Sequence, residues 1–121
     1  IIETLEEGEG ATVPAGSDVR AHYILYDSKL SELQNSYKMS AQAQQPAPSF
    51  NLGSVVKGWT LGVQNMKKGG RYRLYLPYDL AYGERGSDII EPYETLMFEM
   101  EILEYGEAGS LQQPRRPSMG M

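Results

Sequence analysis

The order of elements between Val55 and Leu103 constrains the fold of this chain more than any other feature. The segment reads VVKGWTLGVQNMKKGGRYRLYLPYDLAYGERGSDIIEPYETLMFEMEIL and holds the only tryptophan of the 121 residues. A short helical pattern comes first, followed by an alternating strand, a long loop with tyrosine and glycine, and a second alternating strand. This order indicates an apolar pocket built around a helix.

The helical pattern predicts one short α-helix over residues 56–66. Its apolar positions are spaced i, i+4 and i+7 and therefore share one face: Trp59, Val63 and Met66. Lys67-Lys68 is expected in the final turn, where it complements the helix dipole. Gly69-Gly70 then supplies a left-handed stop.

Alternation of apolar and polar residues predicts the strands, at residues 18–26, 71–77 and 95–103, with an edge strand at 1–5 and extended chain at 49–55. Antiparallel strands around one short helix form the simplest assembly, an α+β domain. The stretch 27–48 is polar and predicts a long connection with a poorly fixed middle. The polar tail from Gly106 onward is expected to be weakly structured by itself.

Composition removes several classes of function. A net charge of −5 argues against nucleic acid as the principal partner. With one histidine and no cysteine, neither a zinc site nor a catalytic triad has enough residues, and we expect no metal and no cofactor. No apolar run is long enough to span a membrane. Because the chain begins at Ile1, we expect it to be processed or cut from something longer.

The loop from Asp79 to Tyr93 supplies the candidate pocket residues. It is long for a domain of this size, and such loops are usually functional or disordered. Apolar residues stand at both of its ends, in Ala81-Tyr82-Gly83 and in Ile89-Ile90. They either cap the core or line a ligand site, and the loop alone leaves both readings open. The sequence leaves two roles for Trp59 as well, a core residue or the floor of a pocket.

Taken together, these motifs resemble the FKBP-type peptidyl-prolyl isomerases, and the bacterial branch in particular. The resemblance rests on VVKGW, GVQNMKKGGR, LPYDLAYGERG, IIEP and ETLMFEMEIL, with a weaker match upstream in LEEGEGATVPAGSDVRAHY. It implies a twisted antiparallel sheet wrapped around one short helix, with an isomerase domain at 1–105 and a flexible or partner-held tail at 106–121. It also implies rotation of Xaa-Pro bonds in client proteins during folding.

The resemblance assigns a role to each site residue. It implies three catalytic residues: Trp59 as the floor under the proline ring, Phe98 as a wall, and Tyr82, whose hydroxyl binds a substrate carbonyl. The Val56 backbone N–H would be a second donor. The implied substrate-binding residues are Tyr23, Leu33, Gln34, Phe50, Val55, Val56, Ile89 and Ile90.

The chain departs from the family pattern on one side of this site. Where the family has a Phe-Asp pair, this chain has Leu33-Gln34, and Pro48 replaces an aromatic two residues before Phe50. The wall loses an aromatic ring and the rim loses a carboxylate, because glutamine carries no charge. These departures bear on the rate and on macrolide binding. Two functions stay open: an isomerase with reduced activity, or a non-catalytic subunit that binds or docks proline peptides within a larger assembly.

Partners and compartment are the weakest inferences from the sequence. An acidic chain without cysteines would survive in an oxidising space, so we expect the periplasm or cell envelope, with the cytoplasm as the alternative. Gln113-Pro114 and Arg116-Pro117 are Xaa-Pro bonds within the tail. A protein complex or a neighbouring pocket holds this tail in one reading, and it is a plain linker in the other.

Overall fold

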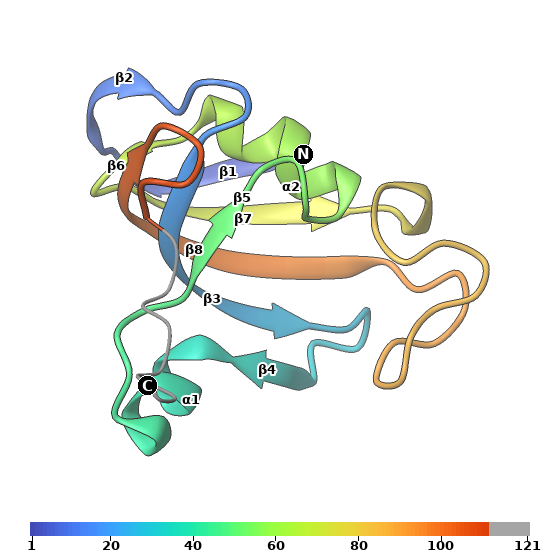
Figure 1. Ribbon diagram of the computed structural model, residues 1–121. Coiled ribbons are helices and arrows are strands. Elements are labelled where there is room, and N and C mark those ends of the chain that lie inside the picture. The colour runs from blue at the N-terminus through green and yellow to red at the C-terminus, as the bar shows by residue number, and fades with distance from the viewer. Residues whose placement is uncertain (112–121) are drawn as a thin grey trace.

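A six-stranded antiparallel sheet forms the body of the computed structural model, which describes residues 1–111 (Figure 1). The strand order is β1-β7-β8-β3-β4, and β5 pairs with the first part of β3. The bounds are β1 Ile2–Glu6, β3 Asp18–Tyr26, β4 Glu32–Asn35, β5 Ser49–Asn51, β7 Arg71–Leu76 and β8 Leu96–Gly106. The predicted strands at 18–26, 71–77 and 95–103 are therefore confirmed, and β1 lies at an edge as expected.

Alternation along the central strands places the core on one face of the sheet. On β3, β7 and β8 the buried side chains are Val19, Ala21, Leu25, Tyr72, Leu74, Leu76, Leu96, Phe98, Met100 and Ile102. The intervening residues, such as Arg73 and Glu99, point to the other face and are partly exposed. Because successive side chains of a strand point to opposite faces, this register fixes which side of the sheet receives a helix.

Two glycines let helix α2 (Lys57–Gly62) lie directly on the core face. A Cβ on Gly58 would overlap the side chain of Leu76, and one on Gly62 would lie 2.8 Å from Leu74 Cδ1. The helix therefore approaches β7 more closely than side chains at these positions would permit. Trp59, between the two glycines, is held against the sheet as a result.

The predicted helix over 56–66 is shorter than expected. After Gly62 the chain tightens into a 3₁₀ helix, Val63–Asn65, although Trp59, Val63 and Met66 are buried as predicted. The placement of Lys67-Lys68 in a final helical turn is wrong. These two residues form β6, which pairs with β2 (Glu9–Thr12) in a separate small sheet.

The prediction of a loosely held connection over 27–48 is also wrong. This stretch contains β4 and an eight-residue helix, α1 (Ser36–Ala43), so the described residues hold two α-helices rather than one. Asn35 caps α1, because its side chain accepts a hydrogen bond from Lys38 N. Figure 1 shows α1 beside β4, far from α2. The predicted extended chain at 49–55 is strand only over 49–51.

Helix α1 covers part of the outer face of the sheet through Tyr37. Its ring stacks on His22 with centroids 4.1 Å apart, and its hydroxyl donates to Glu101 Oε1 at 2.7 Å. Ser36, fully buried, accepts a hydrogen bond from Tyr23 N at 2.7 Å and lies 2.8 Å from His22 Nδ1. A helix that composition alone did not predict is thus fixed by buried polar contacts.

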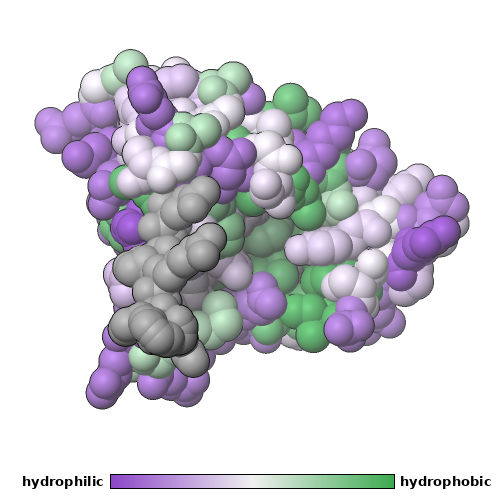
Figure 2. Space-filling model, in the orientation of Figure 1, coloured by the Kyte–Doolittle hydropathy of each residue, from purple (hydrophilic) through white to green (hydrophobic). Residues whose placement is uncertain are grey.

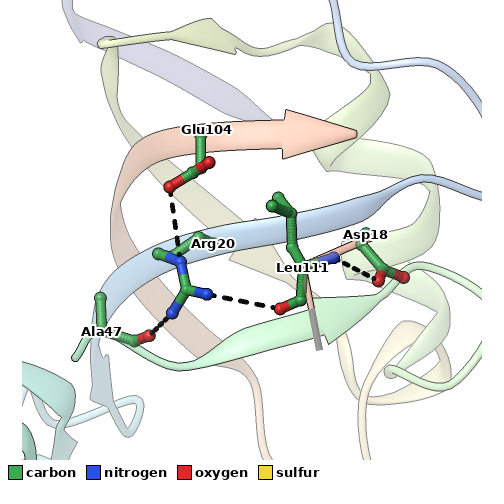
Figure 3. Close-up of polar contacts among 5 residues, drawn as sticks. All are labelled: Asp18, Arg20, Ala47, Glu104 and Leu111. Atoms are coloured by element: carbon green, nitrogen blue, oxygen red, sulfur yellow. Dashed lines mark hydrogen bonds and ion pairs between the residues drawn. The ribbon is translucent and has the colours of Figure 1, made fainter. Parts of the chain in front are cut away.

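The chain after β8 is held by two side chains of β3, Asp18 and Arg20 (Figure 3). Asp18 Oδ2 accepts hydrogen bonds from Gly109 N at 2.8 Å and Leu111 N at 3.1 Å, and Arg20 donates to the Leu111 carbonyl at 3.5 Å. A hydrogen bond from Asn51 is the largest cause that lowers the pKa of Asp18, and these two backbone N–H groups add to it. Residues 106–111 therefore pack on β3.

The rest of the predicted tail, residues 112–121 with Pro114 and Pro117, lies outside the described residues. Within residues 1–111, no helix has the length and apolar character needed to cross a membrane.

Candidate functional site

The floor of the candidate site is a cluster of aromatic rings around Trp59. Three rings meet the indole edge-on or nearly so: Tyr23 from β3 at 5.4 Å, Phe50 from β5 at 5.0 Å, and Phe98 from β8 at 5.4 Å between centroids. Trp59 is only 5% exposed and Phe98 only 3%. T-shaped pairs of this kind favour a defined ring geometry, so the floor is rigid.

A pocket of about 330 Å³ opens above this floor. Figure 2 shows apolar residues around a hollow in the middle of this face of the molecule. The lining residues are Tyr23, Gln34, Phe50, Ser54, Val55, Val56, Trp59, Tyr82 and Phe98. None of these nine side chains carries a charge, so the pocket is apolar at its base and neutral throughout.

Apart from the Trp59 indole N–H, which is buried without a hydrogen-bond partner among the described residues, the polar side-chain groups of the lining lie at the rim. The Tyr23 hydroxyl donates to Gln34 Oε1 at 3.2 Å. Burial raises the pKa of Tyr23, and the neighbouring phenol of Tyr82 adds to the shift, so Tyr23 stays a proton donor. Among the described residues, neither the Tyr82 hydroxyl nor the Val56 backbone N–H has a hydrogen-bond partner. Both are free to bind a ligand.

The loop that carries Tyr82 is shaped by a glycine. Gly86 has φ of +68°, and a Cβ there would overlap the carbonyl oxygen of Ile90. Its N–H donates to the Tyr82 carbonyl at 3.1 Å, and Ser87 N donates to the Ile90 carbonyl at 2.8 Å. These turns place the Tyr82 ring at the pocket and bury Ile90 below the loop.

The structure brings eight of the predicted site residues together around one pocket: Tyr23, Gln34, Phe50, Val55, Val56, Trp59, Tyr82 and Phe98. It does not bring the other three to the lining. Ile90 is buried in the core at 3% exposure, Ile89 is 47% exposed on the loop, and Leu33 packs partly buried against the core. Pro48 is not a lining residue either, and its carbonyl accepts the Ala21 N–H at 3.1 Å.

Ser54 lines the pocket and was missed by the sequence analysis. The prediction treated 49–55 as one extended segment, which gives this residue no distinctive position. The available signal was Asn51-Leu52-Gly53-Ser54, a turn-forming series directly before Val55. In the structure, Asn51 closes this turn by accepting hydrogen bonds from Gly53 N and Ser54 N.

Fold and site together define a small α+β domain with a neutral aromatic pocket facing solvent. The model of the FKBP-type peptidyl-prolyl cis-trans isomerase family matches residues 9–103. An FK506-binding protein of Neisseria meningitidis serogroup A is 35% identical over 111 residues, which cover 88% of this chain and 96% of that protein. The FKBP-type peptidyl-prolyl cis-trans isomerase FkpA of Escherichia coli K12 is 38% identical over 106 residues, covering 86% of this chain and 37% of that one.

Solved structures agree with the sequence comparison. The crystal structure of FkpA from Escherichia coli superposes with a TM-score of 0.80 at 34% identity, covering 88% of this chain and 48% of that chain. A peptidyl-prolyl cis-trans isomerase from Pseudomonas syringae gives a TM-score of 0.76 at 33% identity. The chain thus spans nearly all of the Neisseria protein but under half of FkpA.

The chain belongs to the FKBP-type peptidyl-prolyl cis-trans isomerases. It has their FKBP-like α+β fold and is a peptidyl-prolyl cis-trans isomerase of proline-containing peptides that functions in protein folding. The sequence-based recognition of the family is therefore confirmed, and the non-catalytic alternative gains no support from these comparisons.

Proposed function

We propose that the pocket above Trp59 is where this isomerase binds the prolyl ring and lets the Xaa-Pro bond rotate. The observation that carries the proposal is a rigid aromatic floor, Trp59 with Tyr23, Phe50 and Phe98, in a pocket with no charged lining residue. A volume near 330 Å³ suits a proline with the backbone on either side of it.

Rotation needs neither a nucleophile nor a proton shuttle. Resonance holds the imide planar behind a barrier of ~18–20 kcal/mol. The planar form is strongly dipolar, and the twisted form loses much of that charge separation. An apolar site with little water therefore destabilises the planar ground state relative to the twisted transition state, which is the difference that lowers the barrier.

Two unpaired donors at the rim hold the peptide while the bond turns. The Tyr82 hydroxyl and the Val56 N–H have no partner among the described residues, which supports their roles as donors to substrate carbonyls. Both residues are in the pocket lining. Fixing the backbone on either side of the imide makes rotation a local event at one bond.

We propose that the rate is lower than in a pocket with a carboxylate at the rim. Gln34 contacts Tyr23 by a hydrogen bond but brings no charge to the pocket. Leu33 and Pro48 are not aromatic and neither lines the pocket, so they add no aromatic ring to this wall. The rim therefore has a weaker field at the imide than a carboxylate would supply.

The remaining assignments rest on the sequence. We propose that residues 1–105 act as the isomerase domain and that 106–121 is a tail held by a partner, with Xaa-Pro segments of client proteins as substrates. The contacts of Asp18 and Arg20 with Leu111 give this tail a fixed starting point. The absence of cysteine supports a compartment in the cell envelope.

The test is cis/trans exchange of a Leu-Pro peptide measured by NMR, with the natural chain, Trp59→Ala and Gln34→Asp. We expect exchange above the uncatalysed rate in the natural chain, loss with Trp59→Ala and a gain of several-fold with Gln34→Asp. Full activity in Trp59→Ala would remove the pocket from the mechanism. Peptide binding without exchange would support the docking function instead.

A further inference from the structure

Gln34 differs from the other polar groups of the rim because its amide is held in one orientation. The hydroxyls of Ser54 and Tyr82 have no hydrogen-bond partner among the described residues and rotate freely. The Gln34 amide oxygen, in contrast, accepts the Tyr23 hydroxyl at 3.2 Å. Gln34 also lies opposite Leu25 in the register of β3 and β4, which fixes its backbone.

The partner that orients Gln34 is itself immobile. Tyr23 packs edge-on against Trp59 and at 65° to Phe50, and its backbone N–H is bound by the buried Ser36. Burial raises the pKa of the Tyr23 hydroxyl, so it keeps its proton and acts as the donor. A donor hydroxyl requires an acceptor, and of the two ends of a carboxamide only the oxygen accepts.

Orientation of the oxygen toward Tyr23 turns the other end of the amide away from it. Gln34 Nε2 carries two N–H donors, and the described residues provide no partner for either. Because Gln34 lines the pocket, this part of the rim offers the two N–H donors of a neutral amide. A bound peptide can satisfy these donors only with an oxygen of its own.

We propose that Gln34 determines substrate specificity by donating from Nε2 to a side-chain oxygen on the residue that precedes proline. The inference rests on the proposed function of the pocket. The carbonyl of that residue is half of the rotating imide, so its side chain is held beside the rim while the prolyl ring occupies the floor. The preferred substrates are Glu-Pro and Gln-Pro segments, and Lys-Pro and Arg-Pro segments are disfavoured because a cation has no acceptor to offer.

The experiment uses four peptides that differ only before proline, with Glu, Gln, Leu or Lys at that position. NMR exchange gives kcat/KM for each. We expect Glu-Pro and Gln-Pro to exceed Lys-Pro by about threefold to tenfold, as a hydrogen bond at a partly exposed rim allows. A preference for Glu-Pro without one for Gln-Pro would point to recognition by a cation and overturn the assignment to an amide donor.

Two variants test the residue itself. Gln34→Glu keeps an acceptor for Tyr23 but replaces the donors with a negative charge, so Lys-Pro should now exceed Glu-Pro. Gln34→Leu removes both ends of the amide and should give similar kcat/KM values for all four peptides. An unchanged ratio of Glu-Pro to Lys-Pro in Gln34→Glu would overturn the proposal, and circular dichroism on both variants confirms that they fold.

Glu32→Gln is the matched control, because it changes the charge of the same strand outside the pocket lining. It should leave the Glu-Pro to Lys-Pro ratio within about twofold; a ratio that follows Glu32 instead of Gln34 would overturn the assignment. The Leu-Pro peptide separates the two hypotheses. If the natural chain does not catalyse exchange of Leu-Pro, the proposed function is contradicted. If it catalyses exchange with the same kcat/KM for all four peptides, only the proposed specificity is contradicted.

Discussion

The floor and the rim of the pocket are held in place by different forces. On the floor, Trp59 and Phe98 are more than nine-tenths buried and touch other rings. At the rim, Tyr82 is 40% exposed and its hydroxyl has no partner among the described residues. The floor is therefore part of the hydrophobic core and contributes to stability, whereas the rim contributes little to stability and is available for binding.

The difference between floor and rim predicts different effects of mutation at the two places. A change on the floor alters folding and catalysis together, because the same contacts serve both. A change at the rim alters catalysis alone. The two kinds of site can be distinguished by measuring stability and kcat/KM on the same variants, and Trp59→Ala and Tyr82→Phe test the separation.

The largest effect is expected for Trp59→Ala. Removing the indole leaves a cavity beneath three rings, and large-to-small changes of this kind cost about 3–5 kcal/mol of unfolding free energy. Urea unfolding measures this loss, and NMR exchange should show activity lost even below the unfolding midpoint. Leu61→Ala is the control, since Leu61 lies on the same helix but is 51% exposed. A loss of stability under 1 kcal/mol, roughly the value for a surface change, would place Trp59 outside the core.

A smaller effect, confined to activity, is expected for Tyr82→Phe. The change removes one hydroxyl at the rim, and loss of a single hydrogen bond of this kind lowers kcat/KM by about fivefold to tenfold. The melting temperature should stay the same. Tyr78→Phe is a close match, because Tyr78 is 39% exposed, its hydroxyl has no partner among the described residues, and it is not in the pocket lining. Equal effects from the two variants would show that the Tyr82 hydroxyl has no special role.

The same division explains what could be predicted from the sequence. The floor was predictable because buried apolar residues recur at regular spacing in the sequence. They occupy every second position on β3, β7 and β8, and Trp59, Val63 and Met66 follow helical spacing. The loop pattern left Ile90 open between core and pocket, and the family resemblance assigned it to the pocket wall, whereas the structure buries it in the core.

Helix α1 was missed because its stability does not come from an apolar face. Its sequence, SYKMSAQA, has little apolar character, and it is fixed by the Asn35 cap, the Ser36 hydrogen bonds and the Tyr37 ring. The Asn35 cap is a local signal, but the Ser36 and Tyr37 contacts join residues distant in the sequence, and no local pattern reports them. Lys67-Lys68 was misplaced for the same reason, since its partner strand β2 lies more than fifty residues earlier in the chain.

The smallest effect concerns pH and the outer side of Tyr23. Ser36 accepts the Tyr23 N–H at 2.7 Å and also hydrogen-bonds His22 Nδ1 at 2.8 Å, a bond that either group can donate because a hydroxyl both donates and accepts. Burial lowers the pKa of His22, against the opposing charge of Glu101 from β8, while the neutral Tyr37 ring stacks on its face. The folded-state pKa is therefore below the unfolded value of about 6.5.

Stability should accordingly be full above about pH 6.5 and fall as the pH drops toward the folded-state pKa, because only the unfolded chain takes up the proton in that window. One group limits the slope to about 1.4 kcal/mol per pH unit. Urea unfolding at about pH 7.5 and about pH 5.5 measures the loss, and the carboxylates titrate at lower pH. His22→Gln, which keeps an acceptor for Ser36, should remove the slope; a slope that persists would assign it to groups other than the only histidine of the chain.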